Sequence, residues 1–332
     1  PLPENVHLLT SDLEHQSPLR NWIWSQVKLP SILKELQADV LISMHNFAPF
    51  VHTCPTILLV SNALYFSRMY ERDIRRLDSK LYWDMRMRRI LVNKCIRDAD
   101  LVVTPTQALK SDIMRLCEMP SEKIEVVHWG VDNSIFHSVH GDRLQSPHRS
   151  NLLFVSHHAP HKNFPTLVEA CRLLQDYGQD EFQLTLTISE TENTPHSCRT
   201  VKLIRELGLA DRVQLVGSKS HQESAKLYKK ADLFIFPSYC ESFGLPMVEA
   251  MASGLPIVAS DIPNNREICG SSAVYFPPFD SKALANLLQE VMVNSDLCQS
   301  LTRAGLERGK RFSWQITAGK LLELAAIVNN YR

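Results

Sequence analysis

Glycine is scarce in this chain of 332 residues, and the first 129 residues contain none. The sequence holds 11 glycines in all, beginning with Gly130. A backbone that approaches a phosphate closely generally needs glycine, because a side chain would block the approach. The first 129 residues therefore exclude a glycine-rich phosphate loop, and we expect any nucleotide site in the second half of the chain.

Paired cysteines and long apolar runs are also missing. The eight cysteines are scattered, and the two closest, Cys95 and Cys117, stand 22 positions apart, which excludes a C-x-x-C metal or redox motif. Scattered thiols are typical of a reducing compartment, so a cytoplasmic protein is predicted. The strongest apolar runs, Ile57–Val60 and Leu233–Phe236, are strand-sized and far below the ~18 residues of a membrane span. The polar start of the chain shows no secretory signal.

Neither sign of charge is in excess, because 36 Lys and Arg residues balance 36 Asp and Glu residues. General nucleic-acid binders carry a basic surplus, so the sequence predicts no nucleic-acid partner. Hydrophobic residues make up 44% of the chain, enough for a sizeable core, and the length is typical of two domains.

The second half alternates short apolar runs with amphipathic segments. This pattern is typical of βαβ units that form a parallel sheet covered on both faces, and right-handed crossovers then give a doubly wound layer. The predicted strands are Leu152–Ser156, Gln183–Ile188, Val213–Gly217, Leu233–Pro237, Pro256–Ser260 and Ala273–Phe276, with helices near 164–175, 198–207, 221–230, 245–253 and 281–293.

The first half repeats this rhythm more loosely. Strands are predicted at Val6–Thr10, Val40–Ser43, Thr56–Ser61, Leu101–Thr104 and Ile124–His128, with helices at 19–37, 68–97 and 107–117. We therefore expect an α/β protein with two Rossmann-like, doubly wound domains facing a cleft. The expected parts are an N-terminal domain (1–137), a polar linker (138–150), a C-terminal domain (151–312) and a final helix (313–332) that could cross back to the first domain.

Two carboxylates, Glu241 and Glu249, flank the turn between a predicted strand and the next helix in the stretch Ala231–Asp261. The backbone amides at this helix start are suited to bind a diphosphate, because they lie at the positive end of the helix dipole. A carboxylate beside a phosphate would be repelled, so Glu241 and Glu249 are expected to accept hydrogen bonds from sugar hydroxyls instead. The amides in question belong to Ser242, Phe243, Gly244 and Leu245.

The stretch PSYCESFGLPMVEAMASGLP resembles the E-x7-E signature of retaining glycosyltransferases of family 4, which have the GT-B fold. The resemblance implies that Glu241 contacts the transferred sugar and that Glu249 holds the ribose. It also implies a retaining glycosyltransferase that moves a sugar from a nucleotide-diphosphate sugar to an acceptor hydroxyl in polysaccharide or glycolipid assembly, without a metal or other cofactor. For an isolated pair of glutamates, a loop charge and a solvated helix face would be the alternative.

A second segment, Asn151–Ala170, is similar to the strand–loop–helix element that clamps the donor diphosphate in this family. Lys162 matches the lysine of the clamp, and a flexible ammonium can reach a phosphate there. His157 and His161 occupy places where the family's companion arginine occurs. A zinc site formed by His157, His158 and His161 is an alternative, but no nearby Cys or carboxylate completes four ligands. Lys162 as a catalytic and donor-binding residue is the preferred interpretation.

Weaker candidates lie at other strand ends. Gly217 and Lys219 resemble the family's base-facing loop. The alternative is an ordinary loop, because Gly-Ser often follows a strand. On the acceptor side, the family's usual His is absent after the second strand of the first half, where Ser61 and Asn62 stand instead. The acceptor candidates are His45, Asn46, Ser61, Asn62 and Tyr65.

The opening NVHLLTSD resembles the family's second strand, so the N-terminal domain either lacks one βα unit at its start or builds it differently. The resemblance also leaves two other functions open. One is a non-catalytic sugar-nucleotide-binding or scaffold subunit, because the usual His and Arg are missing, and the other is a GT-B sugar-nucleotide epimerase.

The segment 68–97 holds ten basic and four acidic side chains. Apolar residues recur there at three- and four-residue spacing, which predicts an amphipathic helix that could lie on an anionic membrane from the cytoplasmic side and reach a lipid-linked acceptor. The alternative is a solvated helix that packs this apolar stripe on the first sheet. The stripe consists of Tyr70, Ile74, Leu77, Leu81 and Met85.

Overall fold

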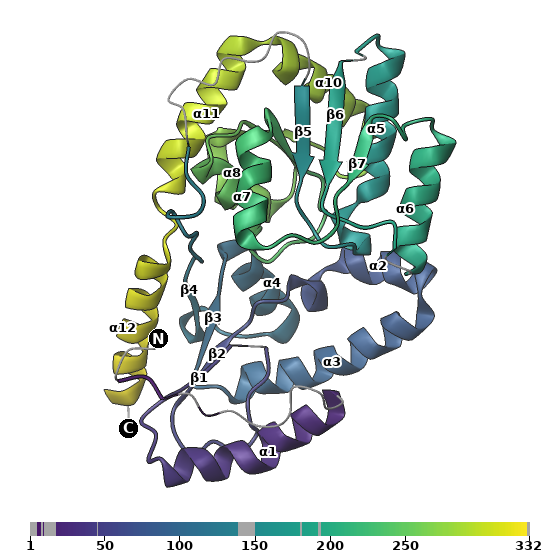
Figure 1. The fold of residues 1–332 in the computed structure, drawn as a ribbon. Helices are drawn as coiled ribbons and strands as arrows, with labels where there is room; N and C mark the ends of the chain where they lie inside the picture. Colours follow the sequence, from purple (N-terminus) through teal and green to yellow (C-terminus); the bar gives the residue numbers. More distant parts are fainter. Residues whose placement is uncertain are drawn as a thin grey trace.

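The structure is a computed structural model that describes residues 5–7, 9, 18–44, 46–138, 150–179, 181–191 and 194–330. Within these residues the chain forms two parallel sheets, each flanked by helices (Figure 1). The N-terminal sheet has the order β1–β2–β3–β4, and the C-terminal sheet has the order β10–β9–β8–β5–β6–β7. The prediction of two parallel α/β layers is confirmed.

The C-terminal sheet is doubly wound, because the strand order reverses between β5 and β8. Its helix α5 packs against α6 and α10, while α8 packs against α11. Its elements are β5 (Ser150–Phe154), η3 (Pro160–Lys162), α5 (Phe164–Asp176), β6 (Phe182–Leu186), α6 (Pro195–Glu206), β7 (Val213–Leu215), α7 (His221–Lys230), β8 (Leu233–Phe236), α8 (Leu245–Ala252), β9 (Ile257–Ser260), α9 (Pro263–Cys269), η4 (Gly270–Ser272), β10 (Ala273–Phe276), α10 (Ser281–Val293) and α11 (Ser295–Gly309).

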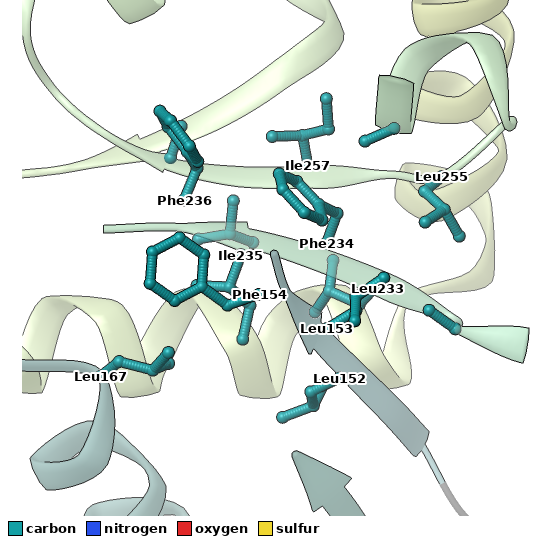
Figure 2. Packing of buried hydrophobic residues seen from close by; sticks show 14 of the residues in the cluster. Leu152, Leu153, Phe154, Leu167, Leu233, Phe234, Ile235, Phe236, Leu255 and Ile257 are labelled. Atoms are coloured by element: carbon teal, nitrogen blue, oxygen red, sulfur yellow. The ribbon is translucent and has the colours of Figure 1, made fainter. Parts of the chain in front are cut away.

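The apolar runs that predicted these strands form the C-terminal core. Every residue of β8 is buried, and Figure 2 shows Phe234 and Phe236 of β8 packed beside Phe154 of β5. Strands that are buried on both faces have sequences of continuous apolar residues rather than an alternating pattern. The carboxyl ends of β5 and β8 are therefore fixed rigidly side by side.

The N-terminal sheet is smaller, and its strands follow one another in chain order. Helices α3 and α4 contribute to the core on one face, and α12 returns from the C-terminal half so that Leu321, Leu324 and Val328 pack on the other face. Its elements are α1 (Pro18–Glu35), β1 (Leu41–Ser43), β2 (Thr56–Leu59), η1 (Ala63–Phe66), α2 (Arg68–Leu77), α3 (Ser79–Asp98), β3 (Leu101–Thr104), α4 (Gln107–Cys117), η2 (Ser121–Lys123), β4 (Ile124–Val126) and α12 (Trp314–Asn330).

Two local predictions were wrong. The single helix expected over 68–97 is divided into α2 and α3 at Asp78, whose extended backbone ends one helix and whose side chain caps the next by accepting from the Leu81 amide at 2.9 Å. In the strand expected at Val6–Thr10, the described residues Val6, His7 and Leu9 belong to no strand, and Leu8 and Thr10 lie outside the described residues. Most of the predicted linker, residues 139–149, lies outside the described residues, and Ser150 already belongs to β5.

The two halves are joined by hydrogen bonds between them. The Glu267 carboxylate of α9 accepts from the backbone amides of Gln107 and Ala108, at 2.7 and 2.8 Å, and so caps α4 of the other half. Ser242 accepts from the Ala63 amide through its hydroxyl and from the Thr106 hydroxyl through its carbonyl, each at 2.9 Å. The loop after β8 is thus held against the N-terminal half.

Candidate active site

The turn from β8 to α8 depends on Gly244. Its φ is +87°, and a Cβ there would lie 2.5 Å from the Cε atom of Met247. Only glycine adopts this backbone conformation without strain. Leu245 then begins α8, and Pro246 occupies the first turn, where its missing N–H costs nothing. The positive end of α8 is consequently presented next to Glu241.

Lys162 and Glu241 form a buried ion pair, with Nζ and Oε1 2.6 Å apart and the two side chains only 9% and 10% exposed. Lys162 ends η3 after β5, and Glu241 lies in the loop after β8. Asn163 supports this arrangement by donating to the Pro237 carbonyl at 3.2 Å. Burial is the largest influence and raises the pKa of Glu241, but the charge and hydrogen bond of Lys162, together with His161 and the Ser238 hydroxyl, outweigh it and hold the pKa below its usual value. The site therefore contains a buried pair of opposite charges beside the start of α8.

Glu249 lies on the second turn of α8, and its carboxylate accepts a hydrogen bond from the Tyr228 hydroxyl at 2.8 Å. Burial raises the pKa of Glu249, and the bond from Tyr228 opposes this rise. Glu241 and Glu249 are thus fixed in different ways, the first by a cation and the second by a neutral donor.

The histidines of the β5–α5 loop do not converge on one point. His161 is buried edge-on to Tyr70 of α2, with ring centres 5.7 Å apart, and burial together with the Lys162 ammonium lowers its pKa to about 3. His158 stacks on Phe164 and bonds Thr200, and its pKa is lowered by burial to about 4. His157 is exposed. In the part of the chain that the structure describes, no group of three or more His, Cys, Asp or Glu residues could hold a metal ion.

Gly217 and Lys219 lie beyond β7, at the same carboxyl edge of the sheet but separated from β5 by β6. Gly217 has a φ of +72°, and its amide donates to the Ile188 carbonyl at 2.9 Å. Lys219 is half-buried. The structure places both residues at the edge that carries Lys162 and Glu241, without a contact between the two groups.

The acceptor-side candidates are brought together in part. The Asn46 side chain accepts from the amides of Ser61 and Asn62 at 2.7 and 3.0 Å, and Asn62 in turn caps η1. Tyr65 is buried in the N-terminal core. His45 lies outside the described residues. The neighbouring Ala63 amide donates to Ser242, so this strand end faces the loop of Glu241.

A cavity of about 550 Å³ lies between the halves, next to Glu241. Its walls come from the start of α2, from α4, from the β8–α8 loop and from the β9–α9 turn, where the Asn264 amide group donates to the Phe243 carbonyl at 3.1 Å. Residues of both halves thus line one cavity together with Glu241.

Three neighbours of the site were missed in the sequence. Tyr228 bonds Glu249, Tyr239 donates from its hydroxyl to Asp73 of α2, and Glu267 caps α4. Tyr239 stands two positions before Glu241, which is a signal that sequence analysis could have used. The other two contacts depend on how helices pack, and nothing in the residue spacing indicates them.

Residues 142–308 match the family of glycosyl transferases group 1, and residues 3–134 match glycosyltransferase family 4. The first match alone covers half of the chain. The chain belongs to the group 1 glycosyltransferases. The resemblance to glycosyltransferases of family 4 is therefore confirmed at the level of the family.

Curated relatives of this glycosyltransferase include the O-antigen chain mannosyltransferase RfbU of Salmonella typhimurium, 28% identical over 61% of this chain and 54% of the relative. The D-inositol 3-phosphate glycosyltransferase of Corynebacterium glutamicum is 27% identical over 83% of this chain and 66% of the relative. The chain thus spans about three fifths of the length of these relatives.

Solved structures with a similar fold include the sucrose-phosphate synthase of Thermosynechococcus elongatus, with a TM-score of 0.76 and 21% identity over 95% of this chain and 81% of that one. HepE of Anabaena, solved in complex with UDP-glucose, has a TM-score of 0.74 and 18% identity over 93% of this chain and 84% of that one. The GT-B fold class predicted for this glycosyltransferase is confirmed.

Proposed function

We propose that this glycosyltransferase transfers a sugar from a nucleoside-diphosphate sugar to an acceptor hydroxyl with retention of the anomeric configuration. The buried pair of Lys162 and Glu241 carries the proposal, because it lies at the carboxyl ends of adjacent strands and beside the positive end of α8. The names of the relatives, a mannosyltransferase and an inositol phosphate glycosyltransferase, support a hexosyl donor.

In the proposed complex the diphosphate lies on Lys162 and on the amides of the β8–α8 turn, Ser242, Phe243, Gly244 and Leu245. Glu241 accepts hydrogen bonds from the hydroxyls of the transferred sugar, and Glu249 accepts them from the ribose. The bond between the anomeric carbon and the phosphate oxygen breaks as the acceptor oxygen bonds to the same face of that carbon. The acceptor proton passes to the departing phosphate oxygen, so no protein nucleophile and no metal take part. The acceptor enters through the cavity between the halves.

Nucleoside-diphosphate binding tests the proposal. One of UDP, GDP and ADP is expected to raise the melting temperature, because a ligand at 100 times its Kd stabilises a folded protein by about 2.7 kcal/mol. Differential scanning fluorimetry measures the shift, and NMR of the transfer product with the matching sugar nucleotide gives the anomeric configuration. An inverted product contradicts retention, and binding without turnover favours a non-catalytic subunit. Conversion of the donor without an acceptor favours an epimerase, and no shift with any of the three nucleotides rejects the donor class.

A contact with an anionic membrane is a second proposal, supported by a different face of α3 from the one predicted. Of the predicted stripe, Tyr70 and Ile74 are buried and Leu81 and Met85 pack against the N-terminal core, which leaves only Leu77 of these five residues exposed. The stripe therefore packs on the protein rather than on lipid. Further along α3, Trp83, Met87 and Ile90 are 63%, 61% and 62% exposed at four- and three-residue spacing. Basic side chains accompany this second stripe. No helix within the described residues is long and apolar enough to cross a membrane.

Charge reversal near this stripe is expected to release the protein from anionic vesicles. The double variant Lys80→Glu/Lys94→Glu, which changes the exposed lysines three residues before Trp83 and four residues after Ile90 on α3, should weaken binding to phosphatidylserine–phosphatidylcholine vesicles by tenfold or more, since each cation near an anionic surface contributes about 1 kcal/mol. Vesicle co-sedimentation measures the effect. The matched control Lys226→Glu/Lys230→Glu makes the same charge change on exposed positions of α7 in the other half. If the wild type ignores these vesicles, or if both variants lose binding equally, the stripe has no such role.

A further inference from the structure

The ring of Tyr228 is locked in the C-terminal core. The side chain is completely buried on α7, and its ring lies 5.6 Å from that of Phe136 and 5.5 Å from that of Phe234. A buried ring held between two others cannot turn away without opening a cavity. The Tyr228 hydroxyl therefore occupies one fixed position at the base of α8.

This hydroxyl is directed at Glu249. It donates to Glu249 Oε2 at 2.8 Å, and the Pro246 carbonyl lies at a longer 3.2 Å. Among the described residues Tyr228 is the only hydrogen-bond donor to the Glu249 carboxylate, so no donor occupies its other oxygen, Oε1. A glutamate on a helix surface otherwise samples several rotamers, and fixing one of them costs conformational entropy.

We propose that Tyr228 is a positioning residue that holds Glu249 with Oε1 turned toward the ribose hydroxyls of the donor. The proposal rests on the proposed function, in which Glu249 binds the ribose. Pre-organisation of this kind raises affinity because the ordering cost is met before the ligand arrives. Glu241, which is proposed to contact the transferred sugar, lies in the loop before α8 and does not contact Tyr228, so the effect should fall on nucleotide binding and leave the chemical step unchanged.

The protonation states of Tyr228 and Glu249 suit the hydrogen bond between them. Burial raises the pKa of the Tyr228 hydroxyl well above its usual value, and the neighbouring Glu249 carboxylate raises it further. The hydroxyl therefore remains protonated. Burial raises the pKa of Glu249, while the bond from Tyr228 and, more weakly, His221 at the start of α7 lower it. Loss of the hydroxyl should therefore raise the pKa of Glu249 further and favour its protonated form, a poorer acceptor for two ribose hydroxyls.

The variant Tyr228→Phe tests the proposal, because it keeps the ring and removes only the hydroxyl. Isothermal titration with the tightest-binding of UDP, GDP and ADP is expected to show an affinity loss of about tenfold, typical of a lost hydrogen bond to a charged group. KM for the donor should rise by a similar factor while kcat stays within about twofold. The pH below which nucleotide affinity falls should be higher in Tyr228→Phe than in the wild type, because the pKa of Glu249 is raised. The matched control is Tyr275→Phe, which removes a hydroxyl that donates to the Gly270 carbonyl at 2.6 Å.

The variant Glu249→Gln separates the failure of this inference from the failure of the proposed function. If Glu249→Gln weakens nucleotide binding and Tyr228→Phe does not, Tyr228 is not a positioning residue. The same follows if the pH below which nucleotide affinity falls is unchanged in Tyr228→Phe. If Tyr228→Phe and Tyr275→Phe lower affinity equally, the effect is a general loss of stability and the inference is rejected. If Glu249→Gln binds the nucleotide like the wild type, the ribose assignment itself is wrong and the role of Tyr228 is rejected with it.

Discussion

Replacement of Glu241 by glutamine is expected to lower kcat by about 100-fold or more, the range found when a pre-organised polar group at a reacting centre is removed. Glutamine keeps the shape of the side chain but loses the charge that pairs with Lys162 Nζ at 2.6 Å. Hydrogen bonds from sugar hydroxyls to a carboxylate strengthen as positive charge develops at the anomeric carbon, so the loss falls on the transition state. Steady-state kinetics with donor and acceptor measure it.

Nucleotide binding distinguishes a role in the reaction from a role in folding. Glu241→Gln should change the Kd for the nucleoside diphosphate by less than about threefold, because the interactions that matter are made in the transition state. The control is Asp98→Asn, which breaks the exposed pair of Lys94 and Asp98 with a 2.7 Å separation. Turnover equal to that of the wild type in Glu241→Gln would remove Glu241 from the reaction. A parallel collapse of binding and turnover would assign it a structural role instead.

The C-terminal sheet could be predicted almost strand by strand because its strands are buried on both faces. An apolar run as short as Leu233–Phe236 favours a central strand over a helix because of its length, and its flanking helices follow from the spacing of apolar residues. The apolar pattern does not define strand ends: β7 ends at Leu215 rather than at Gly217, because a glycine with positive φ belongs to the turn. The division of 68–97 was missed since Asp78 caps a helix in the middle of an otherwise continuous amphipathic pattern.

Residues of the candidate site could be predicted only where they belong to a sequence motif. Lys162 and Glu241 lie 79 positions apart in the sequence, and only the parallel pairing of β5 with β8 brings them to one sheet edge. The burial of the His161 side chain could not be predicted, because the Tyr70 ring that lies against it belongs to the other half of the molecule. The hydrogen bond from Tyr228 to Glu249 is likewise a product of packing between α7 and α8, where sequence spacing carries no information.

Replacement of Lys162 by methionine is expected to act on stability and activity together. It leaves the Glu241 carboxylate buried without its cation, which costs about 3–5 kcal/mol of unfolding free energy. It also removes the cation proposed to bind the diphosphate, so kcat/KM should fall by about 100-fold or more. Urea unfolding and steady-state kinetics measure the two losses. Lys94→Met, at the exposed pair with Asp98, should cost no more than about 1 kcal/mol and leave activity unchanged.

The pH dependence and a double variant distinguish the two losses. In the wild type the pKa of Glu241 is lowered, so its contribution to stability is complete above the unfolded value of 4.5 and is lost as pH falls through the folded pKa. In Lys162→Met the charge and hydrogen bond of the ammonium are gone, so burial prevails and raises the pKa of Glu241, and the penalty should shrink as pH falls toward 4.5. Lys162→Met/Glu241→Met should regain most of the stability, because two apolar side chains replace both charges, and should remain inactive. A stable single variant contradicts the buried pair, whereas an active double variant contradicts its part in the reaction.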